Sequence, residues 1–242
     1  MSQKPKLTVS GYRGIWGKDL NEQNAFGYAL AFAKMIKKRG AKKILVGRDG
    51  RHTGLEILRA IKNAMVKEGI EIDYTGIIPT PSILLLVKKL SYDGGIVITA
   101  SHNPKEYNGF KFVANDGLFI EQEEIKELEE YRKNLDGEIG EYQENFALEN
   151  IETNNKNKEF RKIHIEEILK NVDVNLIKLK KFKVSLDSIN SAGSIITKEL
   201  LEELGCTVNA INGEQTGEST HEPEPLVKNL GQIKEATIKS NS

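Results

Sequence analysis

The sequence predicts an α/β fold, built as two three-layer α/β/α domains with mainly parallel, mixed sheets. Short apolar segments alternate along the chain with longer segments whose apolar residues recur at helical spacing, which is typical of βαβ units. The chain has 242 residues, and a domain commonly holds about 100 to 200 residues. We predict a first domain over residues 1–155 and a second over residues 156–242, which ends early for a closed domain.

The first domain is predicted to alternate helices and strands from residue 25 onward. Its first helix carries Phe26, Leu30 and Ala33 at helical spacing and stops at Gly40, and its second helix stops at Gly69. The third helix follows a proline, which favours a first helical turn. The predicted helices are 25–37, 55–68 and 82–89, and the predicted strands are 43–46, 70–74 and 96–99.

A hairpin and a helix are predicted next. The apolar segments 110–113 and 118–120 flank the sequence Asn-Asp-Gly, which is a strong hairpin signal. A helix is predicted over residues 122–134. Residues 136–158 are polar with little periodicity, as in a connector, and we place the domain boundary near residue 155.

The second domain repeats the alternation of helices and short strands predicted for the first. The same two periodicities predict a helix over 157–170, a strand over 183–186, a helix over 194–204 and a strand over 207–210. A last amphipathic segment begins at Leu226, and no strand follows it. The pattern therefore predicts a second parallel sheet with helices beside it.

Composition excludes several classes of protein. Basic and acidic residues number 35 each, so the formal charge is zero and neither nucleic acid nor an anionic membrane is an expected partner. The longest apolar run, Ile83 to Val87, is far shorter than the roughly 20 residues of a membrane span. The N-terminus lacks an apolar signal core and Cys206 is the single cysteine, so we expect a cytoplasmic protein with a small-molecule partner. The four histidines lack zinc spacing, so any metal is expected to be held by oxygen, and the oligomeric state is left open.

The stretch TASHNPKEYNGFK, residues 99 to 111, carries the first candidate site. A strand that ends at Thr99 places Ser101 at the carboxyl edge of a parallel sheet, where open α/β folds bind ligands. Pro104 stiffens the loop, and Lys111 returns a positive charge toward the serine. A serine nucleophile needs a base, such as His102, or a phosphate already attached to it. The alternative is a polar turn whose side chains only cap the backbone.

Two further stretches are typical of phosphate sites. SGYRGIWG, residues 10 to 17, surrounds Arg13 with glycines, as a phosphate clamp would, although an ordinary glycine-rich turn has the same pattern. GRDGRHTG, residues 47 to 54, lies at a strand-to-helix turn, where a structural ion pair of Arg48 and Asp49 is favoured over direct catalysis. It lacks the P-loop spacing GxxxxGK[ST], and no GxGxxG follows a strand, which disfavours a dinucleotide-binding domain.

In this order, the motifs SGYRG, GRDGR after a strand, and TASHNP closed by NGFK resemble the α-D-phosphohexomutase family of phosphoglucomutases, phosphomannomutases and phosphoglucosamine mutases. LDSINSAGSI and HEPEPL resemble the second-domain turn and the segment that leads toward a third domain, so the resemblance covers about residues 7 to 231. Members of the family have four domains. The resemblance implies that this chain corresponds to the first two, and that the aspartate-rich metal loop and the sugar-selecting loop would follow residue 242.

The resemblance also implies roles for single residues. Ser101 would carry a phosphoryl group, giving it to a hexose phosphate and recovering it from the hexose 1,6-bisphosphate, which also acts as activator. Arg13 and Lys111 resemble the positive partners of that phosphoserine. His102 would orient the phosphate or assist proton transfer, or else only brace the loop. Mg²⁺ would bind a phosphate oxygen on Ser101, with its other ligands in the loop beyond this chain.

The resemblance therefore predicts a phosphohexose mutase that interconverts hexose 1-phosphate and 6-phosphate. The stretches VSGYRGIWG and DGLFI resemble phosphoglucosamine mutases slightly more than phosphomannomutases or phosphoglucomutases. Without the metal and sugar-selecting loops, we expect the 242-residue chain to be inactive alone and to need the C-terminal domains of the same enzyme as partner. The alternative is a non-catalytic sugar-phosphate or protein-binding module derived from the same fold.

Overall fold

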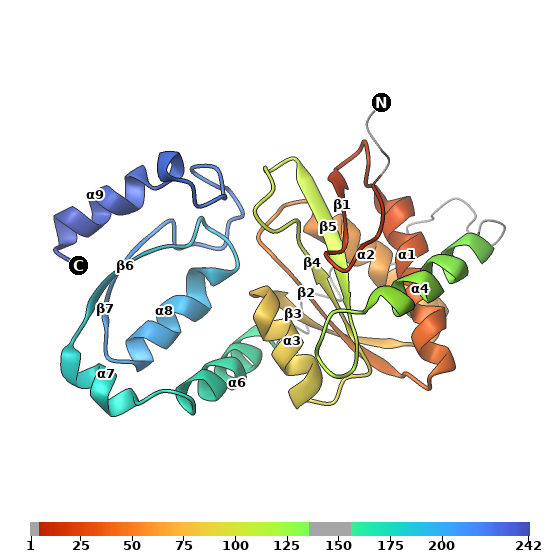
Figure 1. Cartoon of the computed structure of the whole chain (residues 1–242), viewed down its shortest axis with the longest axis horizontal. Coiled ribbons are helices and arrows are strands. Elements are labelled where there is room, and N and C mark those ends of the chain that lie inside the picture. Colours follow the sequence, from red (N-terminus) through yellow and green to blue (C-terminus); the bar gives the residue numbers. More distant parts are fainter. Residues whose placement is uncertain (1–4, 136–155) are drawn as a thin grey trace.

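The computed structural model describes residues 5–135 and 156–242. Figure 1 shows a five-stranded sheet with helices on both faces, followed along the chain by a smaller two-stranded sheet with helices beside it. The predicted α/β architecture is confirmed. The domain boundary predicted near residue 155 lies outside the described residues.

The five-stranded sheet has the order β1-β5-β4-β2-β3. Strand β2 pairs in parallel with both β3 and β4, whereas β5 runs antiparallel to both β4 and β1. Only β5 therefore opposes the common direction, and the predicted mainly parallel, mixed sheet is confirmed. The strands are β1 (Tyr12–Ile15), β2 (Lys43–Arg48), β3 (Glu71–Ile77), β4 (Gly95–Ile98) and β5 (Tyr107–Val113).

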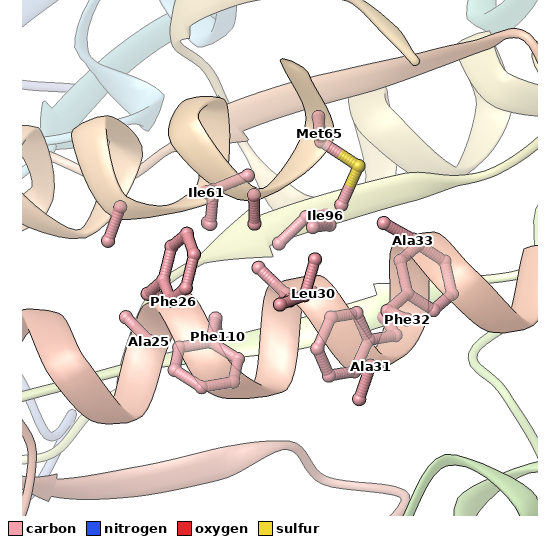
Figure 2. Packing of buried hydrophobic residues seen from close by; sticks show 14 of the residues in the cluster. Ala25, Phe26, Leu30, Ala31, Phe32, Ala33, Ile61, Met65, Ile96 and Phe110 are labelled. Atoms are coloured by element: carbon pink, nitrogen blue, oxygen red, sulfur yellow. The ribbon is translucent and has the colours of Figure 1, made fainter. Parts of the chain in front are cut away.

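Helices cover the two faces of this sheet and bury two hydrophobic clusters. Alternation along β2 separates them, because Ile44 and Val46 face one cluster and Leu45 faces the other. The larger cluster packs α1 and α2 against the sheet, with Leu30, Ile61 and other side chains interdigitated (Figure 2). The helices on this face are α1 (Glu22–Lys38), α2 (Gly54–Lys67) and α4 (Gln122–Asn134), and those on the other face are α3 (Thr80–Lys89) and α6 (Asn157–Leu169).

Local signals explain where several of these helices begin. The Asn21 side chain accepts a hydrogen bond from the Asn24 amide at the start of α1. Helix α4 has a capping box, in which Glu121 and Glu124 satisfy each other's backbone amides. A proline lies in the first turn of α3, as predicted.

The second part of the chain forms a parallel two-stranded sheet, as predicted. Helices α8 and α9 contact this sheet, and they lie on either side of it in Figure 1. Helix α7 was not predicted, because its apolar residues alternate with lysines, and Leu179 is in fact 78% exposed. The elements are α7 (Val174–Lys180), β6 (Lys183–Asp187), α8 (Gly193–Glu203), β7 (Thr207–Ile211), a 3₁₀ turn (Val227–Asn229) and α9 (Gly231–Ser240).

Two predictions about the first sheet need correction. Strand β1 was read only as a glycine-rich phosphate loop, because flanking glycines hide the alternation of a four-residue strand. The second arm of the predicted hairpin is a single bridge between Val113 and Phe119 rather than a strand. The turn itself forms, with Gly117 at a φ of 81°, but the chain leaves the ladder at once to begin α4 at Gln122.

Helix α6 joins the two parts of the chain. Its Phe160 is 2% exposed and belongs to the cluster under α3. The Asn157 amide donates to the carbonyls of Thr75 and Ile77, which covers part of the free edge of β3. Arg161 forms a two-point ion pair with Glu199 on α8, with N–O distances of 2.7 and 2.9 Å. One helix therefore binds both the first sheet and the second part.

Within residues 5–135 and 156–242, no helix is both long and apolar enough to cross a membrane.

We predict that Phe160→Ala lowers the free energy of unfolding by about 3–5 kcal/mol, the usual cost of removing a buried phenyl ring. Urea-induced unfolding followed by circular dichroism measures the change. Phe182→Ala is the matched control, since this ring is 50% exposed, and its loss should cost less than about 1 kcal/mol. Equal costs for the two variants would show that α6 does not depend on this packing.

Candidate active site

Ser101 lies in the turn that follows β4, at the carboxyl edge of the sheet. Its side chain is exposed and its φ is 58°, in the left-handed region that serine rarely adopts. The Ser101 amide donates to Thr99 Oγ1 at 2.9 Å, and its hydroxyl lies 3.3 Å from Nδ1 of the exposed His102. Non-glycine residues held in this conformation concentrate at functional sites.

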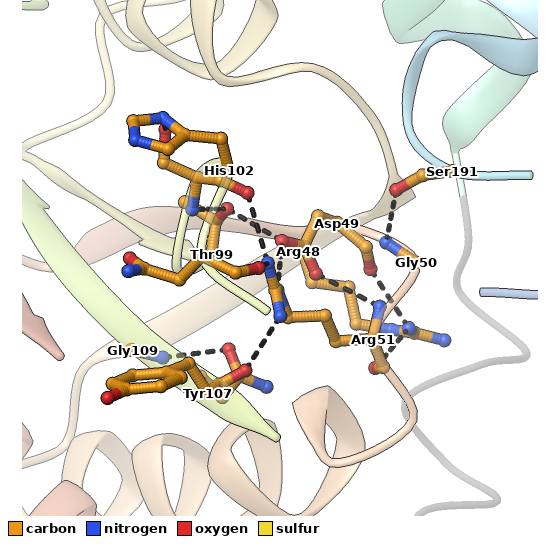
Figure 3. A network of polar contacts seen from close by, with 12 residues as sticks. Arg48, Asp49, Gly50, Arg51, Thr99, His102, Tyr107, Gly109 and Ser191 are labelled. Atoms are coloured by element: carbon orange, nitrogen blue, oxygen red, sulfur yellow. Dashed lines mark hydrogen bonds and ion pairs between the residues drawn. The ribbon is translucent and has the colours of Figure 1, made fainter. Parts of the chain in front are cut away.

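Arg51, from the turn between β2 and α2, lies against this loop (Figure 3). Its guanidinium donates to the carbonyls of Ser101, Asn103, Pro104 and Tyr107 at 2.7 to 3.0 Å. The side chain is only 12% exposed. A residue of the GRDGR motif therefore organises the loop that carries Ser101.

Asp49 completes this network. Its carboxylate accepts hydrogen bonds from Arg51 Nε at 3.1 Å and from Thr99 Oγ1 at 2.6 Å. The predicted ion pair of Arg48 with Asp49 is replaced by this pair of Asp49 with Arg51. Successive side chains leave an extended segment on opposite sides, and Arg48 instead donates to the Tyr74 hydroxyl at 2.8 Å.

Arg13 and Lys111 lie on one face of the β1–β5 ladder. Arg13 is opposite Gly109, and Lys111 is two residues further along β5, so strand alternation directs both away from the aromatic core at Tyr12 and Phe110. A Cβ atom on Gly109 would overlap the Tyr12 carbonyl. The glycine is therefore needed for the close approach of the two strands.

The partners of these two cations are neutral groups. Burial lowers the pKa of Arg13, and the nearby Arg51 lowers it further. The pKa of Lys111 is lowered by burial and then by Arg13. Arg13 donates to Asn103 Oδ1 and the Ser10 carbonyl, both at 3.3 Å, and the Lys111 ammonium lies 4.7 Å from the centre of the Phe119 ring. No carboxylate among the described residues forms an ion pair with either cation.

A cavity of about 560 Å³ lies beside Ser101, between the first and second parts of the chain. Of the four predicted site residues, Ser101 alone lines it; Arg13, His102 and Lys111 do not. Arg13 reaches the loop through a hydrogen bond to Asn103. Lys111 lies close enough to Arg13 for the arginine charge to lower the pKa of Lys111. The lining residues are Asp49, Arg51, His52, Thr53, Ser101, Asn103, Lys105, Glu106, Ile189, Ser191, Gly217, Glu218, Ser219 and Pro223.

The second part of the chain closes one side of this cavity at a contact between two glycines. A Cβ atom on Gly217, whose φ is 76°, would overlap the Gly50 carbonyl oxygen. The Gly50 amide donates to Ser191 Oγ at 3.0 Å, and the Gln215 amide reaches the Ile77 carbonyl at 3.2 Å. Sequence reasoning missed this contact, because no local pattern pairs residues that lie so far apart.

The described residues do not make a complete magnesium site. They contain no group of three or more His, Cys, Asp or Glu side chains placed to hold a metal ion. Ser101 would offer one oxygen, whereas Mg²⁺ prefers six in octahedral geometry. The magnesium that the resemblance implies, with ligands other than Ser101 beyond this chain, therefore stays a prediction.

The fold and site define an α/β/α protein with an exposed serine and a cationic cluster at the carboxyl edge of its sheet. The family model for domain I of phosphoglucomutase/phosphomannomutase matches residues 4–138, and the model for domain II matches residues 162–242. The chain therefore belongs to the phosphoglucomutase/phosphomannomutase family, which confirms the resemblance.

Individual relatives agree with this assignment. A phosphoglucosamine/phosphogalactosamine mutase of Sulfurisphaera tokodaii is 34% identical over 94% of this chain and 49% of its own length. A phosphoglucosamine mutase of Methanocaldococcus jannaschii is 35% identical over 91% of this chain and 46% of its own length. A crystal structure described as a putative phosphomannomutase of Thermus thermophilus superposes with a TM-score of 0.78 at 26% identity, over 96% of this chain and 51% of that one. The chain spans about half the length of these relatives.

We predict that Gly217→Ala destabilises the chain more than Gly17→Ala. Both glycines have left-handed backbones, with φ of 76° and 79°, but nothing lies within 4 Å of a Cβ atom at Gly17. The control should cost about 1–2 kcal/mol from backbone strain, and the overlap with Gly50 adds to that cost at Gly217. Urea-induced unfolding measures the unfolding free energy of both variants. Equal decreases for Gly217→Ala and Gly17→Ala would show that the contact between Gly217 and Gly50 does not contribute to stability.

We predict that the contribution of His221 to the unfolding free energy is lost as pH rises above 6.5. Burial lowers the pKa of this histidine, but the Glu222 carbonyl and the Asp187 carboxylate, 3.0 Å away, together raise it above its ordinary value of 6.5. A raised pKa stabilises the fold while His221 is charged, and this stabilisation is lost as the proton leaves. Urea unfolding at several pH values gives the unfolding free energy of each protein. The advantage of the wild type over His221→Gln should shrink as pH rises above 6.5, and a difference that does not change with pH would refute the assignment.

Proposed function

We propose that this chain forms the phosphoserine half of a hexose-phosphate mutase, with Ser101 as phosphoryl carrier. In the proposed cycle a hydroxyl oxygen of a hexose monophosphate bonds to phosphorus as the bond from Ser101 Oγ to phosphorus breaks. The hydroxyl proton ends on the released Ser101 Oγ, and a hexose 1,6-bisphosphate forms. The reverse transfer from the other end of the sugar restores phosphoserine. The net reaction interconverts hexose 1-phosphate and 6-phosphate.

The observation that carries this proposal is an exposed serine in a loop that Arg13 contacts through Asn103, with Lys111 close enough to Arg13 for the two charges to interact. Both cations are half-buried, and no carboxylate of the described chain forms an ion pair with them. Burial and then a neighbouring cation lower the pKa values of both Arg13 and Lys111, so an anion that approached them would relieve the repulsion between their positive charges. A phosphoserine adds about −1.5 to −2 charges near pH 7. Catalysis of phosphoryl transfer consists mainly of positioning and charge stabilisation, and this cluster supplies charge of the required sign.

His102 is proposed to orient the phosphoryl group. Its Nδ1 lies 3.3 Å from the Ser101 hydroxyl, at the long end of hydrogen-bond distance, and the ring is exposed. This position also suits a residue that assists proton transfer, or one that only braces the loop. Mg²⁺ is proposed to bind a phosphate oxygen on Ser101, with its other ligands outside the described residues, where it would offset phosphoryl charge.

The proposed substrate is a hexose phosphate, with an amino sugar favoured. Relatives from Sulfurisphaera tokodaii and Methanocaldococcus jannaschii are named for glucosamine phosphate, whereas one from Thermococcus kodakarensis is named phosphoglucomutase/phosphomannomutase. Because the chain spans about half of each, we propose that turnover needs the other half of the relatives' length as partner.

We predict that glucose 1,6-bisphosphate transfers one phosphoryl group to Ser101, seen by intact-mass analysis and peptide mapping. The chain is tested alone and after fusion to the second half of the Methanocaldococcus jannaschii relative, and the fusion is also assayed for mutase turnover. Ser101→Ala should abolish loading. Ser91→Ala is the matched control, because Ser91 is also exposed and left-handed, with a φ of 55°.

Two outcomes would contradict the carrier role. One is phosphate attached to a residue other than Ser101 in the fusion. The other is a fusion that turns over sugar phosphate while Ser101→Ala leaves its rate unchanged. If the fusion folds and binds sugar phosphate without any loading or turnover, the non-catalytic binding module is the better description.

A further inference from the structure

The Arg51 guanidinium has all of its hydrogen-bond donors occupied. An arginine side chain carries five N–H donors in a fixed plane. Four of them reach the carbonyls of Ser101, Asn103, Pro104 and Tyr107, at 3.0, 2.7, 2.8 and 2.8 Å respectively. The fifth, on Nε, donates to the Asp49 carboxylate at 3.1 Å. Arg51 therefore has no donor left for a phosphate or a sugar.

Arg51 and Asp49 hold the peptide groups on both sides of Ser101. The Ser101 carbonyl accepts from Arg51 Nη2 at 3.0 Å. On the other side the Ser101 amide donates to Thr99 Oγ1, whose hydroxyl donates to Asp49 at 2.6 Å. The ion pair of Arg51 with Asp49 joins these two contacts. Ser101 is thereby fixed in a left-handed conformation that isolated serine disfavours.

Arg13 differs from Arg51 in this respect. Arg13 makes two side-chain hydrogen bonds, one to the Ser10 carbonyl and one to Asn103 Oδ1. It therefore keeps donors that a phosphoryl group can use, whereas Arg51 does not. The two arginines thus differ at the loop, because Arg51 uses every donor on backbone carbonyls and Asp49, whereas Arg13 does not.

We infer that Arg51 is a positioning residue for phosphoryl transfer at Ser101, acting through the four loop carbonyls rather than through the substrate. The inference rests on the proposed function in one respect, namely that Ser101 is the group whose position matters. Loss of Arg51 should then lower the rate of transfer and leave substrate affinity unchanged. A misplacement of about 1 Å at a reacting group can cost about 100-fold in rate.

The first test measures the loop without any chemistry. Hydrogen exchange by mass spectrometry compares the wild-type chain with Arg51→Ala and Arg51→Lys. We expect the peptide spanning residues 99–107 to exchange about tenfold faster or more in both variants, with strands β2 and β4 unchanged. Lysine keeps the charge but is a point donor that cannot span four carbonyls. Arg39→Ala removes an exposed arginine that pairs with α4, and should leave the loop unchanged.

The second test measures transfer. The loading rate of Ser101 from glucose 1,6-bisphosphate is recorded against bisphosphate concentration in the fusion described above. We expect Arg51→Ala to reduce the maximal rate about 100-fold and to leave the half-saturating concentration unchanged. Guanidinium chloride, far below its denaturing range, should restore part of the rate and of the loop protection. The same concentration of sodium chloride should restore neither.

The outcomes separate this inference from the proposed function. If wild-type Ser101 takes no phosphoryl group, the proposed function fails, and hydrogen exchange still decides whether Arg51 holds the loop. If exchange in residues 99–107 is unchanged in Arg51→Ala, or faster exchange spreads through the whole sheet, the inference is overturned. It is also overturned if the loop loosens and loading proceeds at the wild-type rate, or if only the half-saturating concentration changes.

Discussion

One planar guanidinium holds the candidate site together. Arg51 belongs to the turn after β2. Three of its five donors bind carbonyls of the loop after β4, a fourth binds the Tyr107 carbonyl at the start of β5, and the fifth binds Asp49. The loop has little packing of its own, since Ser101 and His102 are exposed. Its conformation therefore depends on hydrogen bonds from a neighbouring strand end. The residue next to Arg51, Gly50, also carries the contact to the second part of the chain.

Charge is distributed unevenly around this anchor. Elsewhere in the described chain two arginines are neutralised directly by carboxylates, Arg39 by two glutamates on α4 and Arg161 by Glu199. Behind the Ser101 loop, Arg13 and Lys111 have neutral partners, and their pKa values are lowered by burial and by other cations. A chain with no net charge thus keeps two cations without carboxylate partners near the Ser101 loop, where their charge would stabilise a phosphoryl group.

Sequence pattern predicted the regular elements better than the contacts of the site. Helix α4 has the predicted bounds, Gln122–Asn134, because periodicity and a capping box agree there. Strand β1 was missed because glycines interrupt its alternation. The contacts of Arg51 with the loop were missed because its partners there are backbone carbonyls. Every residue type carries a backbone carbonyl, so these partners leave no signal in the sequence. Family membership followed from the order of three motifs, but the chemical roles of their residues are not visible in any spacing.

Helix α6 has a consequence for how the protein tolerates change. Asn157 and Phe160 bind it to the first sheet, and Arg161 binds α8, all within two turns of its start. The relative position of the two parts that line the cavity is thus held by α6. A change that shifts this helix is accordingly expected to move Ser191 and Gly217 relative to Ser101, even when the changed residue does not line the cavity itself.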